Sequence, residues 1–332
     1  VLQRILTTGG IAIFIFLGVR QSADVHIYEW FLWIGGLGAF LLFVISLIYA
    51  GRFMKLRLTW DYRLIKSLFL SAAPFSAAYL LMAVYRQLDV LFLALLRPDF
   101  AIQNAYYGFA GRVEDMAFLV PTFLLNSLLP MLSERLKNNQ PADRLLGKSL
   151  LILLLSGSVF FLFSVFWARP LALLFATSAY VSTPLHPGSD TAFQLMALPM
   201  FLNGLVLYAF YVFLAKRDWK RLTISFGFGA ALSIILNLLW TKSLGFVGAG
   251  SALVTVYCAL TILLLPQALR AVPAHFPLAS LAKWLVFTIV LGEALFFSAP
   301  FITSELHTII GFSASLVLML VLVKVCGLDR IL

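Results

Sequence analysis

The chain alternates between long apolar stretches and short polar connections. A transmembrane helix needs about 20 apolar residues to cross roughly 30 Å of hydrocarbon. The stretches that meet this length predict spans at about 3–19, 30–50, 66–96, 104–132, 147–168, 190–215, 219–241, 246–269, 280–299 and 306–326. The third and fourth are long enough to tilt or to project beyond the bilayer. The pattern therefore predicts an all-α polytopic membrane bundle of about ten transmembrane helices, with no room for a separate soluble domain.

The composition excludes the main alternatives. Of 332 residues, 62% are hydrophobic and 11% are charged, and the mean hydropathy is +1.00. Soluble domains carry about 25% charged residues, so this chain has too few to cover a globular surface. A soluble enzyme, a secreted disulfide scaffold and a disordered chain are all excluded. The two cysteines, Cys258 and Cys326, form no metal-ligand spacing.

The basic residues predict an orientation. Of the 24 Lys and Arg residues, 18 fall on one side of the ten-span arrangement and two inside spans, and the other side holds only Arg20, Arg97, Arg169 and Lys242. Cytoplasmic loops collect Lys and Arg. Both chain ends are therefore expected to be cytoplasmic, and the basic excess indicates membrane orientation rather than nucleic-acid binding.

The tryptophans lie near the ends of the predicted spans. Indole rings favour the headgroup region, so we expect anchoring there by Trp30, Trp33, Trp60, Trp167, Trp219, Trp240 and Trp284.

Charged residues are concentrated in two neighbouring spans. Span 66–96 contains Arg86 and Asp89, one helical turn apart, and the next span contains Arg112, Glu114 and Asp115. A charge at mid-membrane costs about 2.5–3.5 kcal/mol, so such residues are functional candidates. Two compatible interpretations stay open: these side chains join the two helices, or they line a water-filled cavity.

The spacing predicts how these charges pair. If the turn between the two spans lies near Phe100, Asp89 precedes it by eleven residues and Arg112 follows it by twelve. Arg86 precedes it by fourteen residues and Asp115 follows it by fifteen. At about 1.5 Å per residue, each opposite pair reaches a similar depth. We therefore expect Asp89 beside Arg112 and Arg86 beside Asp115.

Other functional motifs are missing from the sequence. The histidines are scattered, GxSxG and Walker patterns do not occur, and the glycines of GFVGAG at 245–250 do not follow the GxGxxG spacing. Glu293 is the single acidic residue of the span 280–299. It is expected to pack between helices or to extend its carboxylate to the membrane interface. The sequence predicts neither an enzyme nor a cofactor or metal site.

Four stretches carry a family resemblance. They are Pro74 followed by YRQLDVLFL, then AYYGFAGRVEDMAFLVPTFLLNSLLPMLSERL, then LALLFATSAYVSTP, and Asn237 followed by GFVGAGSALVTVY. Together they cover roughly 66–265. In this order they resemble the Wzx-type polysaccharide flippases of the multidrug/oligosaccharidyl-lipid/polysaccharide exporter superfamily.

The resemblance implies a two-lobe exporter fold whose first lobe is incomplete here. Residues 1–65 would hold the last two helices of that lobe and a basic cytoplasmic linker, 66–269 the six-helix second lobe, and 270–332 two additional helices. About four further helices are expected before Val1, which is not an initiator Met.

The implied function is transport of a polyprenyl-diphosphate-linked oligosaccharide across the bacterial cytoplasmic (inner) membrane for surface polysaccharides such as the lipopolysaccharide O-antigen. Arg86, Arg112 and Asn126 are the candidates for substrate or cavity contacts, and Asp89, Glu114 and Asp115 for binding a coupling H⁺ or Na⁺. Contacts with other polysaccharide-assembly proteins stay open. The alternatives are an ion-coupled drug or lipid II exporter of the same superfamily, and an integral-membrane polysaccharide polymerase or ligase.

Overall fold

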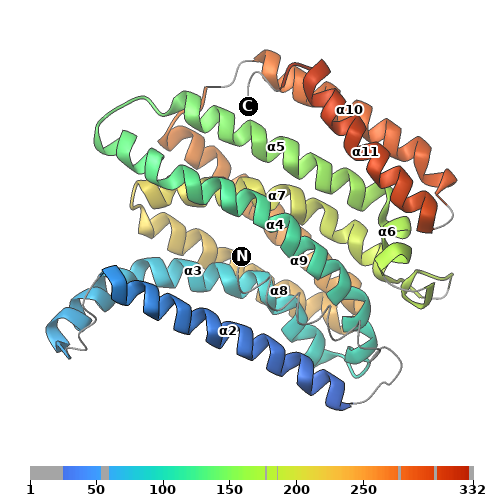
Figure 1. Ribbon diagram of the computed structural model, residues 1–332, viewed down its shortest axis with the longest axis horizontal. Coiled ribbons are helices and arrows are strands. Elements are labelled where there is room, and N and C mark those ends of the chain that lie inside the picture. Colours follow the sequence, from blue (N-terminus) through green and yellow to red (C-terminus); the bar gives the residue numbers. More distant parts are fainter. Residues whose placement is uncertain are drawn as a thin grey trace. The chain divides into compact units, whose positions relative to one another are not determined.

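A computed structural model describes residues 25–53, 60–175, 178–184, 186–275, 278–302 and 305–328 (Figure 1). The predicted span at 3–19 lies outside these residues. The described chain consists of helices joined by short connections, and the described residues contain no strand. Its α-helices are α2 (Val25–Phe53), α3 (Tyr62–Leu96), α4 (Phe100–Lys137), α5 (Asp143–Phe166), α6 (Ala168–Phe175), α7 (Ser189–Ala215), α8 (Trp219–Leu244), α9 (Phe246–Ala271), α10 (Leu278–Ser298) and α11 (Glu305–Val325).

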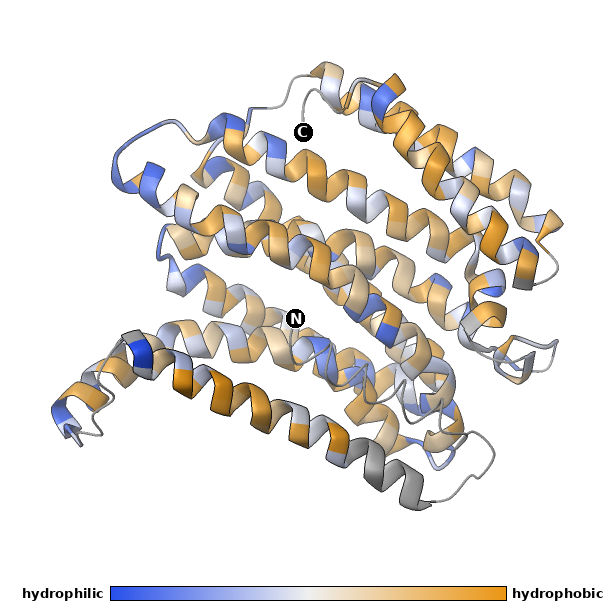
Figure 2. Cartoon of the chain, viewed as in Figure 1, coloured by the Kyte–Doolittle hydropathy of each residue, from blue (hydrophilic) through white to orange (hydrophobic). Residues whose placement is uncertain are grey.

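Among the described helices, nine are long and apolar enough to cross a membrane, and only the short α6 is not. They coincide with nine of the ten predicted spans. Figure 2 shows hydrophobic residues along most of each long helix, with polar residues gathered near the turns. The chain is therefore a multi-pass membrane protein with an all-helical fold.

The chain divides into two compact units, Val1–Leu68 and Phe69–Leu332. In the first unit α2 is the main described helix, and most of its side chains beyond residue 32 are exposed. The guanidinium of Arg52 lies 5.5 Å from the ring centroid of Tyr49, one helical turn away. The second unit holds every cavity and cluster discussed below.

Helix α7 forms the centre of the second unit. Its residues are apolar on all sides, as is typical of a fully buried helix, and 83% of its most apolar segment is buried. It packs against α4, α5 and α9, and α8 packs against α9. Gly157 on α5 allows the closest approach, because a Cβ there would lie 2.9 Å from the ring of Phe201. Small residues at such positions let membrane helices pack tightly.

Helices α10 and α11 pack on α5 and α6 around a second apolar cluster (Figure 1). Trp167 is fully buried in this cluster, and its indole N–H donates to the Leu295 carbonyl at 3.1 Å. The Trp284 indole donates to Ser158 Oγ at 3.0 Å. These two tryptophans are therefore held by contacts inside the helical bundle. Their positions near helix ends are as predicted, but neighbouring helices satisfy their N–H groups.

Candidate functional site

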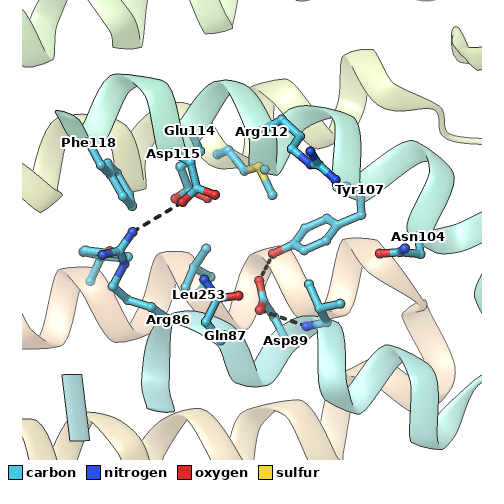
Figure 3. Close-up of a pocket in the computed structure, with 15 residues that line it drawn as sticks. Arg86, Gln87, Asp89, Asn104, Tyr107, Arg112, Glu114, Asp115, Phe118 and Leu253 are labelled. Carbon is cyan, nitrogen blue, oxygen red and sulfur yellow. Dashed lines mark hydrogen bonds and ion pairs between the residues drawn. The ribbon is translucent and has the colours of Figure 1, made fainter. Parts of the chain in front are cut away.

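A cavity of about 320 Å³ lies between α3 and α4, and one residue from α7 and two from α9 contribute to its wall (Figure 3). All five charged residues that the sequence placed in these spans line it. The complete lining consists of Arg86, Gln87, Asp89, Val90, Asn104, Tyr107, Gly108, Gly111, Arg112, Glu114, Asp115, Phe118, Met196, Leu253 and Tyr257. The cavity therefore brings together charges from two helices inside the membrane-spanning part of the bundle.

The lining of α4 follows helical periodicity. Tyr107, Gly111, Glu114 and Phe118 recur at intervals of four, three and four residues, which places them on one face of the helix. On α3, Arg86 and its neighbours three and four positions later share a face for the same reason. The two faces meet because a short turn joins α3 and α4 into a hairpin.

Arg86 is held by two groups of α4. Its Nη2 lies 3.5 Å from Asp115 Oδ1, and its guanidinium carbon lies 4.7 Å from the centroid of the Phe118 ring (Figure 3). A guanidinium over an aromatic face is attracted by the ring quadrupole. The predicted Arg86–Asp115 pair is therefore confirmed.

The predicted pairing of Asp89 with Arg112 is wrong. Asp89 is buried, and it accepts hydrogen bonds from the Tyr107 hydroxyl and, at 2.8 Å, from the Val90 N–H (Figure 3). The turn is centred on Pro98 rather than two residues later, which places Tyr107 opposite Asp89. Asp89 precedes Pro98 by nine residues and Tyr107 follows it by nine, so these two side chains reach the same depth.

Two charged groups of the cavity lack partners among the described residues. Glu114 is buried, with 8% of its surface exposed, and its Oε1 accepts no hydrogen bond there. Arg112 is exposed, and no carboxylate of the described chain lies within ion-pair distance of its guanidinium. Buried polar groups are normally matched, so these two groups are the ones available to a ligand.

Aromatic side chains form the back of the cavity. Tyr257 of α9 lies edge-on to Tyr85, with ring centroids 5.7 Å apart, and 6.1 Å from Phe118. Its hydroxyl donates to Asn203 Oδ1 on α7 at 3.3 Å. This hydrogen bond fixes the ring that closes the cavity toward α7.

Asn126 does not line the cavity, contrary to the prediction. It lies twelve residues beyond Glu114, which is about 18 Å along a helix. Its Oδ1 accepts a hydrogen bond of 2.5 Å from the Tyr211 hydroxyl. Asn126 therefore connects α4 to α7 away from the charged residues.

The sequence reasoning missed the uncharged lining residues. Tyr107 could have been found from its position, because it lies seven residues before Glu114 and therefore on the same face of α4. Tyr257 carried no such signal, because its contribution depends on how α9 packs against α4.

We call Arg86, Asp89, Tyr107, Glu114 and Asp115 the cavity cluster.

A second polar cluster lies at the α3–α4 turn. Arg97 donates from Nε and Nη2 to the two carboxylate oxygens of Asp99, each at 2.8 Å, and from Nη1 to the Lys242 carbonyl at 3.1 Å. Gln103 donates to Asp99 Oδ2 at 2.9 Å and accepts from the Phe246 N–H at 3.0 Å. We call Arg97, Asp99 and Gln103 the turn cluster. It connects the α3–α4 turn to the α8–α9 turn.

The turn cluster stabilises the ionised form of its carboxylate. Hydrogen bonds from Arg97 and, to a smaller extent, from Gln103 lower the pKa of Asp99 to about 2. The same ion pair raises the pKa of Arg97.

Neither family models nor curated protein sequences give a match to this chain. Among the described residues, three or more His, Cys, Asp or Glu side chains do not come together as a group that could hold a metal ion.

Proposed function

We propose that the protein is a flippase that moves a polyprenyl-diphosphate-linked oligosaccharide across the bacterial inner membrane by alternating access. The observation that carries the proposal is the charged cavity within the membrane-spanning helices. Gln87, Arg112 and Asp115 are exposed at its rim. Such side chains are costly in contact with lipid and face water-filled cavities or other protein. A transport pathway provides that environment.

Arg112 is the group proposed to contact the diphosphate. The charge of Arg86 is balanced by Asp115, whereas Arg112 has no carboxylate partner in the described chain. A guanidinium presents several donors in a plane and binds phosphate oxygens through paired hydrogen bonds. In this proposal the diphosphate enters the cavity while the prenyl tail stays in lipid.

Glu114 is the carboxylate proposed to bind the coupling ion. Asp89 already accepts two hydrogen bonds and Asp115 pairs with Arg86, but Glu114 Oε1 has no partner in the described residues. Proton relays in transporters use carboxylates inside the membrane. Binding of H⁺ or Na⁺ at Glu114 would change the charge of the cavity that Arg112 also lines, and so couple the ion to the substrate.

One observation favours the second candidate, an ion-coupled exporter of cationic drugs. The cavity is lined by three carboxylates and two guanidinium groups, so its acidic groups outnumber its basic ones. A cationic substrate would use this excess, and Arg112 would oppose its binding.

Transport measurements on the Arg112→Gln variant distinguish the flippase from the exporter of cationic drugs. The full-length protein is reconstituted in vesicles with a polyprenyl-diphosphate oligosaccharide, and an added glycosidase reports the sugar that reaches the outer leaflet. We expect at least a roughly tenfold lower rate, because a bidentate charged contact is lost, with recovery in Arg112→Lys. The control is Arg169→Gln, an exposed arginine outside the cavity. An unchanged flipping rate, or faster export of a cationic dye by Arg112→Gln, would overturn the flippase proposal.

We also propose that both chain ends face the cytoplasm. Reporter fusions after Lys148 and Lys220 are expected to report the cytoplasmic side, and fusions after Asp99 and Thr183 the outer side. The support is the distribution of Lys and Arg along the chain. Helix α4 lies between Asp99 and Lys148, so fusions after these two residues must report opposite sides of the membrane. The same side at both positions would contradict the arrangement.

A further inference from the structure

A second hollow lies where α4 ends and α5 begins, away from the transport cavity. Its volume is about 580 Å³, within the range that small-molecule sites occupy, roughly 300–1,000 Å³. Its lining consists of Arg135, Pro141, Asp143, Arg144, Leu145 and Lys148. Because it lies at the ends of two membrane-spanning helices, we expect it near the lipid headgroups.

The chain builds this hollow from both sides of one turn. Arg135 lies in the last turn of α4, and its Nη1 donates to the Pro141 carbonyl at 2.9 Å, which holds the guanidinium against the connection. Arg144 and Lys148 are four residues apart near the start of α5, so they share a face of that helix.

The segment between α9 and α10 supports the rim. The His275 N–H donates to the Asp143 carbonyl at 3.0 Å. Gly147 lies directly against the same segment, since a Cβ there would come within 2.1 Å of the His275 carbonyl oxygen. The start of α5 is therefore fixed in place, and the hollow is a built feature of the fold.

The cations of the hollow lack carboxylate partners. Across the described ranges, no carboxylate lies within ion-pair distance of Arg135, Arg144 or Lys148. By contrast, Arg97 and Arg221, which also lie near helix ends, each pair with an aspartate, at 2.8 and 3.2 Å. Three cations and the single carboxylate of Asp143 leave the hollow with an excess of positive charge.

We propose that this hollow binds a phosphate group. Guanidinium and ammonium donors around a concave site are the chemistry that recognises phosphate oxygens. At this level of the membrane, the phosphate comes from an anionic lipid headgroup or from soluble phosphate. The proposal is independent of transport, because none of these residues lines the cavity between α3 and α4.

The test compares two pairs of charge-removing substitutions in the full chain. Arg144→Gln with Lys148→Gln removes two cations of the hollow. Lys137→Gln with Lys220→Gln removes two cations from nearby helix ends that do not line it. Thermal unfolding is followed in nanodiscs of phosphatidylcholine containing increasing phosphatidylglycerol, and in pure phosphatidylcholine nanodiscs with added inorganic phosphate. Salt is kept at 0.15 M, where exposed distant charges are largely screened.

Each single substitution in the hollow is expected to weaken apparent binding roughly fivefold, and the pair roughly 25-fold. The control pair is expected to change it by less than about twofold. The single variants keep the test decisive if the double variant does not fold.

A response to phosphatidylglycerol alone identifies a lipid headgroup as the source, whereas a response to inorganic phosphate in pure phosphatidylcholine identifies soluble phosphate. Equal losses in both pairs, or no response to either probe in the unmodified protein, would overturn the proposal.

Discussion

The α3–α4 hairpin carries two arginine–aspartate pairs with different surroundings. In the turn cluster, Asp99 accepts from both Arg97 and Gln103. Gln103 in turn accepts from the start of α9, and Arg97 donates to the end of α8. Every side chain of this cluster has a partner that the fold supplies.

In the cavity, by contrast, some of the polar side chains have no partner. Arg86 and Asp115 make one contact of 3.5 Å, and the Oε1 atom of Glu114 has no partner in the described chain. Arg112, which lines the same cavity, has no carboxylate partner there either. An unmatched polar group is more costly inside a membrane than at its surface. The difference indicates that the turn cluster holds helices together, whereas the cavity cluster leaves groups free for a ligand.

The largest expected effect comes from Glu114→Gln. We expect the transport rate to fall at least about tenfold, because an amide neither binds a proton nor attracts a cation. Stability should change little, since removing an unpaired buried carboxylate is not costly. The measurement is initial flipping rate beside thermal unfolding in the same detergent.

The matched control for Glu114→Gln is Asp99→Asn, which makes the same kind of change in the turn cluster. It should leave the transport rate within about twofold, because a surface ion pair contributes little. If Asp99→Asn reduced transport as strongly as Glu114→Gln, the distinction between the two clusters would fail.

Tyr107→Phe tests Asp89, the buried carboxylate of the cavity cluster that accepts hydrogen bonds from Tyr107 and Val90. The substitution removes the hydroxyl that donates to Asp89, and an unmatched buried acceptor costs about 1–3 kcal/mol. We expect the free energy of unfolding to fall by that amount. In the neighbouring Tyr106, the described contacts of the side chain are between rings. Tyr106→Phe should therefore stay within about 0.5 kcal/mol, and equal losses in the two variants would refute the assignment.

The sequence predicted the helices well because their signal is local. Apolar length determines each span, and the alternation of Lys and Arg between loops checks the count independently. Nine spans were found at the predicted places. The burial of Trp167 could not be predicted, because it depends on α10 and α11 packing on α5.

The site was predicted in part, and the error has a geometric cause. Placing the turn at Phe100 instead of Pro98 shifts the expected partner of any residue by four positions, which is about 6 Å along the opposite helix. The shift applies equally to both predicted pairs, yet Arg86 still reaches Asp115. Asp89 instead bonds to Tyr107, which lies at its own depth on α4. Depth alone therefore does not determine which of the two pairs forms.

Gly245→Ala tests the turn cluster through its backbone. Gly245 has φ of +59°, and an added Cβ would lie 2.5 Å from Gln103 Oε1, the atom that accepts from Phe246. We expect a loss of about 1–2 kcal/mol in the free energy of unfolding, because an L side chain is strained there and displaces Gln103.

The control is Gly227→Ala within α8, where the new Cβ would make an ordinary contact of 3.8 Å with Leu81. It should be neutral or stabilising by up to about 1 kcal/mol, because alanine favours a helix more than glycine does. A loss of stability in Gly227→Ala as large as in Gly245→Ala would show that the turn cluster has no special role.

The smallest expected effect is the pH dependence that Asp99 contributes. Its pKa in the folded protein is about 2, below the ordinary value of 3.8, so the folded state favours the ionised form. The resulting stabilisation is complete above about pH 4 and is lost as the pH falls toward 2. Asp99→Asn removes this contribution, so its deficit relative to the unmodified protein should be less than about 1 kcal/mol near pH 6. The deficit should shrink between pH 4 and pH 2, measured as the difference in unfolding midpoint at each pH. A deficit that is constant across this window would mean that the Arg97–Asp99 pair does not stabilise the turn through its charge.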